Sequence, residues 1–346
     1  MIKIQNKLVG SRQPCFLIAE IAQAHNGSIA EAHKYIDLAA KAGADAVKFQ
    51  THIAKAESTL NEPFRTQLGV RDRSRYAYWR RMEFSFKQWS GLARHARQKG
   101  LIFLSSPFSD EAVDMLRKLG QPAWKIGSGE AVSGQLLDTI LKKTEGVILL
   151  STGMSSFAEI KKMVKKVTKA RRKLVLLHCV SEYPTPLKNT GVNIMTILQR
   201  MLKVPCGLSD HSGTVFPAIG AIVLGANVVE LHLVKDRSSR GFDASSSLTP
   251  EEFLQVRKFR DAWHTMSYRV EEKNQLIKRT QKIRKIFGRS LALIKPCPAG
   301  TIITSKLLTL KKPGTGIPLK NKKNLIGKIL KHNVPENILL QKTDIK

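Results

Sequence analysis

The sequence predicts an α/β fold in which eight parallel strands close into a barrel, the (β/α)8 or TIM barrel. Eight short β-rich runs occur in order, and helix-like segments separate them. Regular alternation of this kind predicts a parallel sheet with right-handed crossovers, and eight units suggest a closed barrel. The β-rich runs are residues 16–21, 46–50, 101–106, 123–128, 147–151, 174–179, 206–212 and 228–233.

Helical patterns fill the intervals between these runs. Two glycines support the repeating unit, because Gly43 in KAGAD and Gly225 in GAN each end a helix-like segment just before a strand. The clearest helix-like segments are residues 28–42, 86–99, 109–119, 134–143, 156–170 and 193–202.

The composition is that of a globular protein. Of 346 residues, 42% are hydrophobic and 25% are charged, which excludes disordered and fibrous classes. The longest apolar stretch, residues 216–229, is shorter than the roughly 20 residues of a spanning helix, so we expect no membrane span. The N-terminus lacks the apolar core of a signal peptide, and the four cysteines lack disulfide or CxxC spacing. A cytoplasmic location is therefore expected.

The chain is strongly basic, with 58 Lys and Arg against 27 Asp and Glu. This balance permits nucleic acid, an acidic membrane surface or an anionic metabolite as a partner. The densest basic run, residues 161–173, keeps apolar residues at helical spacing and predicts the solvated face of an amphipathic helix. Residues 71–82 mix arginines with aromatic residues and are the candidate nucleic-acid segment. They belong to an insert, residues 51–84, whose length predicts a lid or wall at the barrel mouth.

Each β-rich run turns polar at its C-terminal end, which is where barrel enzymes hold their chemistry. Side chains two positions apart share a face of a strand, so Lys48 lies with Gln50 and Glu230 lies with His232. The polar residues at these ends are Glu20, Lys48, Gln50, Ser105, Ser106, Lys125, Ser128, Glu130, Ser151, Thr152, His178, Ser181, Ser209, Asp210, His211, Glu230 and His232.

Two lysines, Lys48 and Lys125, lie inside apolar runs. A buried lysine is unfavourable unless an anion or a carboxylate pairs with it. The sequence therefore predicts an anionic ligand at the barrel mouth. Ion pairs with Glu20, Glu130 or Glu230 are the alternative explanation.

Hydroxyl groups at the strand ends fit a phosphorylated ligand. Ser105, Ser106, Ser128 and Ser209 stand where hydroxyls and backbone N–H groups bind phosphate oxygens, although a single serine is also an ordinary helix N-cap.

Two histidines indicate a metal. His211 and His232 end consecutive strands beside Asp210 and Glu230, a pattern typical of a divalent metal site. Two imidazoles leave positions open for water and substrate, and a metal held there acts as a Lewis acid on a carbonyl oxygen. Cys179 lacks ligand spacing and is interpreted, like Cys206, as a small buried hydrophobic residue.

Competing catalytic motifs are missing from the sequence. It contains no GxSxG elbow, no GxxxxGK[ST] phosphate loop and no GxGxxG after a first strand. Hydrolase, NTPase and dinucleotide-binding hypotheses therefore lose their usual support.

Several strand ends and two C-terminal segments form recognisable motifs. They are IAEIAQAHNGS (18–28), VKFQTH (47–52), FLSSPFS (103–109), WKIGSGE (124–130), LSTGM (150–154), LLHCVSEYPTP (176–186), GLSDHSG (207–213), RSLALIKPCPAGTIIT (289–304) and KKPGTGI (311–317). In this order they resemble the sialic acid synthase family, which includes N-acetylneuraminate, legionaminic acid and pseudaminic acid synthases. The resemblance covers nearly the whole chain.

The resemblance implies a TIM-barrel synthase domain over residues 1–270, a linker over 271–286 and a small β-rich SAF (antifreeze-like) domain over 287–346. The alternation of β-rich runs and turns near the C-terminus fits a compact β-rich module independently. In the family, this domain packs over the barrel mouth of a second subunit, which implies a domain-swapped homodimer.

The resemblance also implies a metal-dependent transferase reaction. In the family, phosphoenolpyruvate condenses with an N-acetylated amino sugar, typically N-acetylmannosamine, and water to give a nine-carbon 2-keto acid and phosphate. The residues implied for phosphoenolpyruvate are Lys48, Ser106, Lys125, Ser128, Ser181 and Ser209. Those implied for the sugar are Gln50, Tyr183, Asp243 and Lys312.

Two further roles follow from the resemblance. His211 and His232 are implied as ligands of Mn²⁺ or Mg²⁺. Glu20 is implied to orient or activate the attacking water, and Glu130 to manage protons.

The chain departs from the family pattern at several positions. Many members have Asn at the positions of Ala24 and Ser181, Pro at the position of Phe242, and Arg at the position of Lys312. Arg and Lys are not equivalent at such a contact. These departures leave the sugar open between N-acetylmannosamine and a trideoxy bis-acetamido hexose.

Three alternatives to this function remain at this stage. One is a barrel that condenses phosphoenolpyruvate with an aldose phosphate to give an octulosonate or heptulosonate. Another is a non-catalytic nucleic-acid-binding protein, which would show a steep salt dependence of binding. The last is a catalytically silent scaffold, which the many polar strand ends disfavour.

Overall fold

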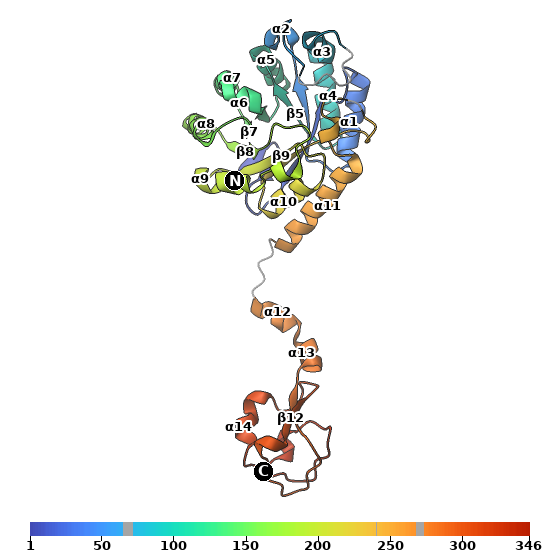
Figure 1. The fold of residues 1–346 in the computed structure, drawn as a ribbon, viewed down its shortest axis with the longest axis vertical. Coiled ribbons are helices and arrows are strands. Elements are labelled where there is room, and N and C mark those ends of the chain that lie inside the picture. Colours follow the sequence, from blue (N-terminus) through green and yellow to red (C-terminus); the bar gives the residue numbers. More distant parts are fainter. Residues whose placement is uncertain (65–71, 240, 268–272) are drawn as a thin grey trace. The chain divides into compact units, whose positions relative to one another are not determined.

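The computed structural model describes residues 1–64, 72–239, 241–267 and 273–346. They form two compact units, Met1–Tyr268 and Arg269–Lys346 (Figure 1). Arg71 of the candidate nucleic-acid segment and residues 271–272 at the start of the expected linker lie outside the described residues.

An eight-stranded parallel sheet is the centre of the first unit, and its strands are the eight that the sequence predicts. Their order is β5-β4-β3-β10-β9-β8-β7-β6. The two end strands lie side by side, and the Gln121 amide bridges them by accepting from Ser105 N at 3.0 Å and donating to Ser105 O at 3.2 Å. The sheet is therefore a nearly closed barrel, as predicted. The strands are β3 (Phe16–Ala22), β4 (Ala46–Thr51), β5 (Ile102–Pro107), β6 (Ala123–Ile126), β7 (Val147–Ser151), β8 (Leu174–His178), β9 (Cys206–Asp210) and β10 (Val228–His232).

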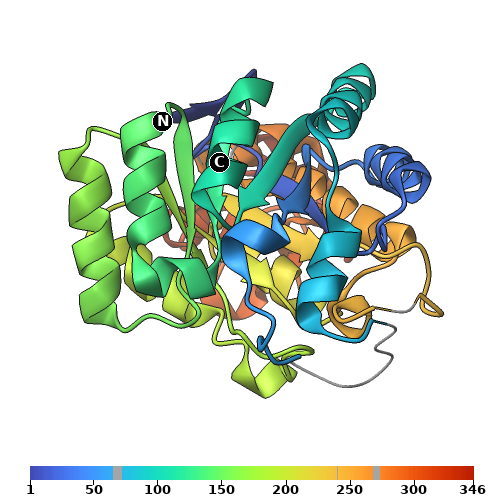
Figure 2. The ribbon, with the colours of Figure 1, turned by 90° about the horizontal axis from the view of Figure 1, so that it is seen from above.

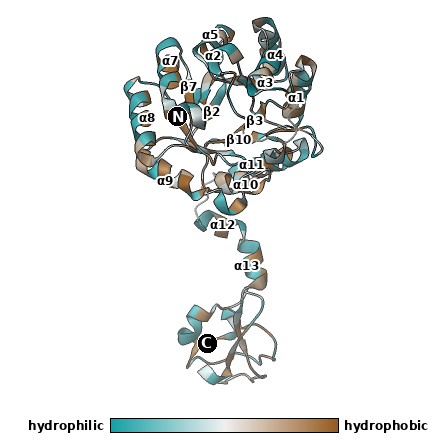
Figure 3. Ribbon diagram, turned by 45° about the horizontal axis from the view of Figure 1, so that its top comes forward, coloured by the Kyte–Doolittle hydropathy of each residue, from teal (hydrophilic) through white to brown (hydrophobic). Residues whose placement is uncertain are grey.

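Helices form the outer layer around these strands (Figure 2). The six predicted helices are present: α1 (Ile29–Lys41), α4 (Phe86–Gln98), α5 (Asp110–Leu119), α7 (Gln135–Lys143), α8 (Phe157–Lys169) and α9 (Asn193–Leu202). Two more complete the layer, α10 (Phe216–Val223) and α11 (Pro250–Ser267). Hydrophilic residues colour much of this layer teal (Figure 3).

The basic run forms a helix of this layer, and the apolar stretch forms a second helix and the start of a barrel strand. On α8, Ile160, Met163 and Val167 are buried while the lysines remain outside, which confirms the predicted solvated face. The apolar stretch supplies α10 and β10. Within the described parts of the chain, no helix is long and apolar enough to cross a membrane.

The lower half of the barrel interior, at the N-terminal ends of the strands, is packed with apolar side chains. A hairpin that sequence patterns did not predict, β1 (Ile2–Ile4) and β2 (Lys7–Val9), closes this end. Its buried residues join one apolar cluster with the inward side chains of seven strands. The cluster comprises Ile2, Ile4, Val9, Phe16, Ile18, Ala46, Ile102, Leu104, Ala123, Val147, Leu149, Val175, Leu177 and Val228.

One buried carboxylate, Asp45, ties the hairpin and α11 to the barrel. Asp45 accepts from Leu17 N at 3.0 Å, from Lys7 Nζ at 3.0 Å and from the Arg260 guanidinium at 2.7 Å. The same guanidinium donates to Cys15 O at 3.0 Å. The Arg260 side chain is buried, and Asp45 is its buried counter-charge. The more exposed carboxylate of Asp261 pairs with the same guanidinium through Nε at 2.7 Å.

The second unit is small and contains more turns than regular strands. Strands β11 (Ser290–Leu293) and β12 (Leu308–Lys311) pair antiparallel, and Leu291, Leu293 and Leu340 belong to its own buried core. Its α-helices are α12 (Lys273–Arg279), α13 (Gln281–Phe287) and α14 (Lys322–Leu325). The short 3-10 helices of the two units are η1 (Leu187–Asn189), η2 (Ala244–Ser246), η3 (Ser305–Leu307), η4 (Leu319–Asn321) and η5 (Lys342–Asp344).

Candidate active site at the barrel mouth

A cavity of about 480 Å³ opens at the C-terminal ends of the barrel strands. This size is typical of small-molecule sites. Thirteen of the residues expected at the site line it: Glu20, Lys48, Gln50, Ser106, Lys125, Ser128, Glu130, Ser181, Tyr183, Ser209, His211, His232 and Asp243. The remaining one, Lys312, belongs to the second unit, where its ammonium lies 5.3 Å from the centre of the Phe287 ring. Its role at the cavity stays a prediction.

Strand alternation explains which residues reach the cavity. In β4, Ala46 points into the lower interior of the barrel. Lys48 and Gln50, two and four positions further along the strand, are on the same face and line the cavity. In β10, Val228 is followed in the same way by Glu230 and His232. The shared faces predicted for these pairs are confirmed.

The same alternation places three of the polar residues from the predicted strand ends outside the cavity lining. Ser105 points outward and its hydroxyl lies 2.7 Å from that of Thr51. His178 points outward to Thr190 O at 2.9 Å, and Asp210 accepts from the Ser212 hydroxyl at 2.7 Å. Ser105 therefore does not face the cavity as expected, because it is adjacent to inward-facing Ser106. Asp210 does not line the cavity either, and its place beside a metal stays a prediction.

The floor of the cavity holds two buried lysines and two buried glutamates. Lys48 Nζ lies 2.5 Å from Glu20 Oε2 and 3.6 Å from Glu230 Oε1, and Lys125 Nζ lies 3.5 Å from Glu230 Oε1. Two of the three carboxylates considered as partners thus pair with the lysines. Burial alone therefore does not demand an anionic ligand.

The two carboxylates differ in proton affinity. Burial raises the pKa of Glu20 above its ordinary value, against the lowering effect of Lys48. At Glu230, burial acts in the same direction, but Lys125 and Lys48 lower the pKa to about 2. When Glu20 is protonated, two ammonium groups face one carboxylate. The floor then carries a positive charge that suits an anion.

Serine hydroxyls surround this floor. Ser106 accepts from Lys48 Nζ at 3.1 Å, and Ser209 donates to Glu230 Oε1 at 3.1 Å. Ser128 accepts from Gly153 N at 3.2 Å and lies 3.1 Å from the Cys179 sulfur. Ser128 begins a short helix, α6 (Ser128–Ser133), where the sequence suggested the last residue of a strand. These hydroxyls are fixed by neighbours and face the same space as the lysines.

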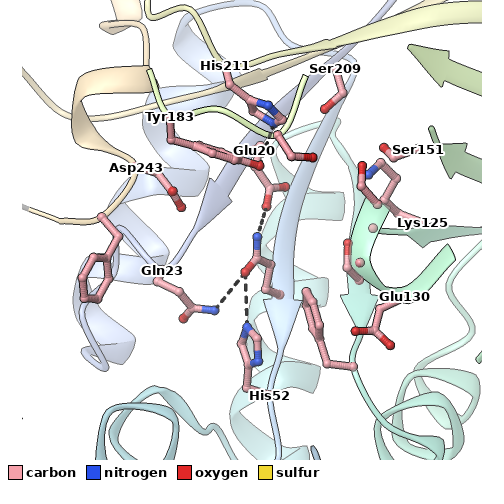
Figure 4. Close-up of a pocket in the computed structure, with 18 of the residues that line it drawn as sticks. Glu20, Gln23, His52, Lys125, Glu130, Ser151, Tyr183, Ser209, His211 and Asp243 are labelled. Atoms are coloured by element: carbon pink, nitrogen blue, oxygen red, sulfur yellow. Dashed lines mark hydrogen bonds between the residues drawn. The ribbon is translucent and has the colours of Figure 1, made fainter. Parts of the chain in front are cut away.

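The two expected metal-ligand histidines lie next to each other, with ring centres 5.4 Å apart. His211 Nδ1 donates to Val180 O at 2.7 Å, and the Tyr183 hydroxyl lies 3.1 Å from His211 Nε2. Burial lowers the pKa of His211 to about 3, so its imidazole is neutral, as a metal ligand requires. His232 Nδ1 lies 4.0 Å from Asp243 Oδ2. Figure 4 shows Tyr183, His211 and Asp243 on the same side of the cavity.

The chemistry of this donor set fits a metal site with open positions. A carbonyl that holds the Nδ1 atom of a ligand imidazole is a common support in such sites. In residues 1–64, 72–239, 241–267 and 273–346, no group of three or more His, Cys, Asp or Glu side chains is placed to hold a metal ion. A metal at His211 and His232 would therefore take its other ligands from substrate and water.

The long insert forms a wall of the cavity, as predicted, where it is described. It contains α2 (Ala54–Glu57) and α3 (Arg75–Met82). Tyr78 and Trp79 of α3 line the cavity. Aromatic residues of the candidate nucleic-acid segment thus face the cavity instead of forming an exposed stacking surface.

His52 stands at the centre of this wall. Its ring is stacked between Trp79, with ring centres 3.8 Å apart, and Phe108, with ring centres 4.2 Å apart. Its Nδ1 atom lies 2.6 Å from Glu57 Oε1. Burial and the nearby charge of Glu57 raise the pKa of Glu130, which lines the same part of the cavity.

Several cavity residues were not predicted from the sequence. Cys179 lines the cavity, and the signal for it was available, because it follows inward-facing Leu177 by two positions. Gln23 lines it without such a signal. A bulge shifts the strand register between Glu20 and Ala22, and Ala22 adopts a φ of 47°, so alternation fails before Gln23.

Comparisons with known proteins agree with this geometry. Residues 35–288 match the NeuB family, and residues 288–346 match the SAF domain. The chain is 33% identical over 335 residues to the N,N'-diacetyllegionaminic acid synthase of Campylobacter jejuni, covering 94% of this chain and 98% of that one. It is 30% identical over 341 residues to the human N-acetylneuraminate-9-phosphate synthase, covering 95% and 92%.

A solved structure has the same architecture. The crystal structure of the N-acetylneuraminic acid (sialic acid) synthetase from Leptospira borgpetersenii, in complex with citrate, superposes with a TM-score of 0.70 at 26% identity. The match covers 82% of this chain and 97% of that one. The chain therefore belongs to the NeuB family, with a TIM barrel and a C-terminal SAF domain.

Proposed function

We propose that this protein condenses phosphoenolpyruvate with an N-acetylated amino sugar and water, releasing phosphate and a nine-carbon 2-keto sugar acid. Relatives that are legionaminic acid, pseudaminic acid and N-acetylneuraminate-9-phosphate synthases support condensation of phosphoenolpyruvate with a sugar. The observation that carries the proposal is the cavity floor, where Lys48 and Lys125 lie among serine hydroxyls in a family synthase barrel.

The floor would bind phosphoenolpyruvate. The phosphate and carboxylate oxygens replace Glu20 and Glu230 as partners of Lys48 and Lys125. The hydroxyls that complete this binding are those of Ser106, Ser128, Ser181 and Ser209.

The reaction forms one carbon–carbon bond and breaks one carbon–oxygen bond. The enol carbon of phosphoenolpyruvate attacks the aldehyde carbon of the open-chain sugar, which leaves a cationic carbon bearing the phosphate. Glu20, at the floor, orients the water that adds there and takes its proton. Phosphate then leaves with the bridging oxygen, and the product is a 2-keto acid.

The sugar would occupy the part of the cavity above the floor. Gln50, Tyr183 and Asp243 contact it, and Glu130 donates a proton to the former aldehyde oxygen. The raised pKa of Glu130 suits this role, because the carboxyl keeps its proton at a higher pH than an exposed glutamate. When bound by His211 and His232, Mn²⁺ or Mg²⁺ supplies Lewis acidity at the aldehyde oxygen.

Phosphate release tests this function. Phosphoenolpyruvate is incubated with N-acetylmannosamine and, separately, with trideoxy bis-acetamido hexoses, each with and without EDTA. We expect release with at least one sugar and its loss with EDTA. No release with any of these sugars contradicts the function, whereas release that EDTA leaves unchanged contradicts only the metal requirement.

We further propose a domain-swapped homodimer in which Lys312 reaches the partner's cavity and contacts the sugar. Mixing Lys48→Met protein with Lys312→Ala protein tests this. In a swapped dimer, mixed dimers contain one cavity with both native residues and regain activity. Absence of any regained activity after subunit exchange contradicts the swap.

A further inference from the structure

A directed chain of hydrogen bonds runs from the floor of the cavity to its wall (Figure 4). Gln50 Nε2 donates to Glu20 Oε1 at 3.0 Å, so the Gln50 amide oxygen faces the other way. That oxygen lies 3.3 Å from Gln23 Nε2 and 3.2 Å from His52 Nε2. Both nitrogens therefore donate to it.

The direction of these hydrogen bonds determines which atoms remain at the two ends of the series. Because Gln23 uses its amide nitrogen on Gln50, its amide oxygen is the end group. Among the residues that the structure describes, this buried oxygen has no hydrogen-bond partner. At the other end, Glu57 Oε1 meets His52 Nδ1 at 2.6 Å, and Glu57 Oε2 is likewise buried without a described partner.

The two atoms without a described partner, Gln23 Oε1 and Glu57 Oε2, are both hydrogen-bond acceptors on residues that line the cavity. A buried acceptor without a donor destabilises the protein, so such an atom in a binding cavity calls for a ligand that brings an N–H or O–H group. Water also supplies such a group. An amino sugar, which carries several hydroxyls and an acetamido N–H, supplies them in fixed positions.

Three carboxyl groups and one arginine line this wall in the described part of the chain. Glu57, Glu62 and Glu130 line it together. Arg75 is the lining arginine in the described part of the chain, and it is already engaged: its Nε lies 3.1 Å from Glu62 Oε1 and it donates to Pro63 O at 3.0 Å. The lysines lie at the floor, beside Glu20 and Glu230.

We propose that Gln23 and Glu57 form a donor-selective subsite for an unphosphorylated amino sugar, with Gln23 as a specificity-determining residue. This inference rests on the proposed function. The subsite binds an N–H or O–H of the sugar through Gln23 Oε1. It disfavours a sugar that carries a phosphate, because the lining arginine of the described part, Arg75, is already engaged by Glu62. The human relative, an N-acetylneuraminate-9-phosphate synthase, makes a phosphorylated product, so the family permits both choices.

The first test compares substrates in the wild-type protein. Phosphate release is measured with the best unphosphorylated sugar and with N-acetylmannosamine 6-phosphate. We expect kcat/KM to favour the unphosphorylated sugar by about 100-fold or more, because on this wall a phosphate meets carboxyl groups and no unpaired arginine among the described residues. Equal or better use of the phosphorylated sugar overturns the inference and leaves the proposed function intact. No release with any sugar overturns the proposed function itself.

The second test removes the acceptor. Gln23→Met keeps the length of the side chain but lacks both polar groups. We expect KM for the sugar to rise about tenfold, the usual consequence of losing one hydrogen bond of this kind, while KM for phosphoenolpyruvate stays within twofold. Gln23→Glu keeps an acceptor oxygen and restores part of the lost affinity.

A matched control separates this effect from a general loss of fold. Gln98→Met makes the same substitution at an exposed position at the end of α4 and leaves both KM values unchanged. Thermal unfolding of each variant shows whether it is folded. If the folded Gln23→Met protein has the same KM for the sugar as the wild type, the inference is overturned. If this variant does not fold, the wild-type substrate comparison still decides it.

Discussion

The lower and upper halves of the barrel interior are built by the same strands and the same alternation, yet their chemistry is opposite. Below, inward positions such as Val228 and Leu177 form an apolar cluster that the N-terminal hairpin closes. Above, the next inward positions on these strands are Glu230 and Cys179, which line the cavity. The lower half therefore supplies hydrophobic stability, and the upper half holds charges whose burial is unfavourable by itself.

This difference predicts which substitutions change stability and which change activity. A change in the lower half should reduce the free energy of unfolding and leave substrate affinity alone. A change in the upper half should reduce turnover far more than stability. The predictions below test this division, in order of decreasing expected effect.

Removal of a floor lysine should have the largest effect. Lys48→Met leaves phosphoenolpyruvate without one ammonium partner, and we expect phosphate release to fall by about 1000-fold. Steady-state phosphate release measures this. The control, Lys165→Met, lies on the exposed face of α8 and should be as active as wild type. Lys48→Met activity within tenfold of wild type would show that the floor does not bind the substrate in this way.

Loss of the buried carboxylate at the lower end should have a large effect on stability. Asp45→Asn removes the buried counter-charge of Arg260 and leaves only the more exposed Asp261 carboxylate paired with this guanidinium, so the free energy of unfolding should drop by about 3 kcal/mol. Urea unfolding measures it. Asp138→Asn breaks an exposed pair with Lys166 and should cost less than about 1 kcal/mol. Equal losses in both variants would contradict a structural role for Asp45.

A cavity in the lower cluster should affect stability alone. Leu177→Ala removes a fully buried side chain and should reduce the free energy of unfolding by about 2–5 kcal/mol. KM for phosphoenolpyruvate at low temperature should stay at the wild-type value. Leu187→Ala, at a side chain that is 52% exposed, is the control for the substitution. A raised KM in Leu177→Ala would mean that the two halves are not separable.

Relief of backbone strain at Ala22, where a bulge shifts the register of β3, should have the smallest effect. Ala22 has a φ of 47°, a conformation that glycine adopts more easily. Ala22→Gly should therefore raise the free energy of unfolding by about 0.5–1 kcal/mol. Ala40→Gly, inside α1, should lower it by a similar amount. Destabilisation in both variants would show that the bulge does not store strain.

Most of the fold could be predicted from the sequence because the barrel strands are apolar runs with clear polar ends. The pairings of Lys48 with Gln50 and of Glu230 with His232 on common faces followed from alternation alone. The closing hairpin was not predicted, because its strands contain only three residues each and carry little periodic signal.

The candidate site was predicted less completely, for two physical reasons. Outward residues such as Ser105 and Asp210 sit next to inward ones, and a list of polar strand ends does not separate the two faces. Gln23 and His52 depend on a bulge and on a long insert, whose shapes arise from tertiary contacts that no local pattern encodes.

Binding of phosphoenolpyruvate to the barrel floor is the measurement that tests this account most directly. Isothermal titration calorimetry compares the wild-type protein with the Lys48→Met, Lys125→Met double variant and with Leu177→Ala. The account predicts binding to wild type and to Leu177→Ala with similar affinity, and at least about 100-fold weaker binding to the double variant. Equal affinity in the wild type and the double variant would contradict it.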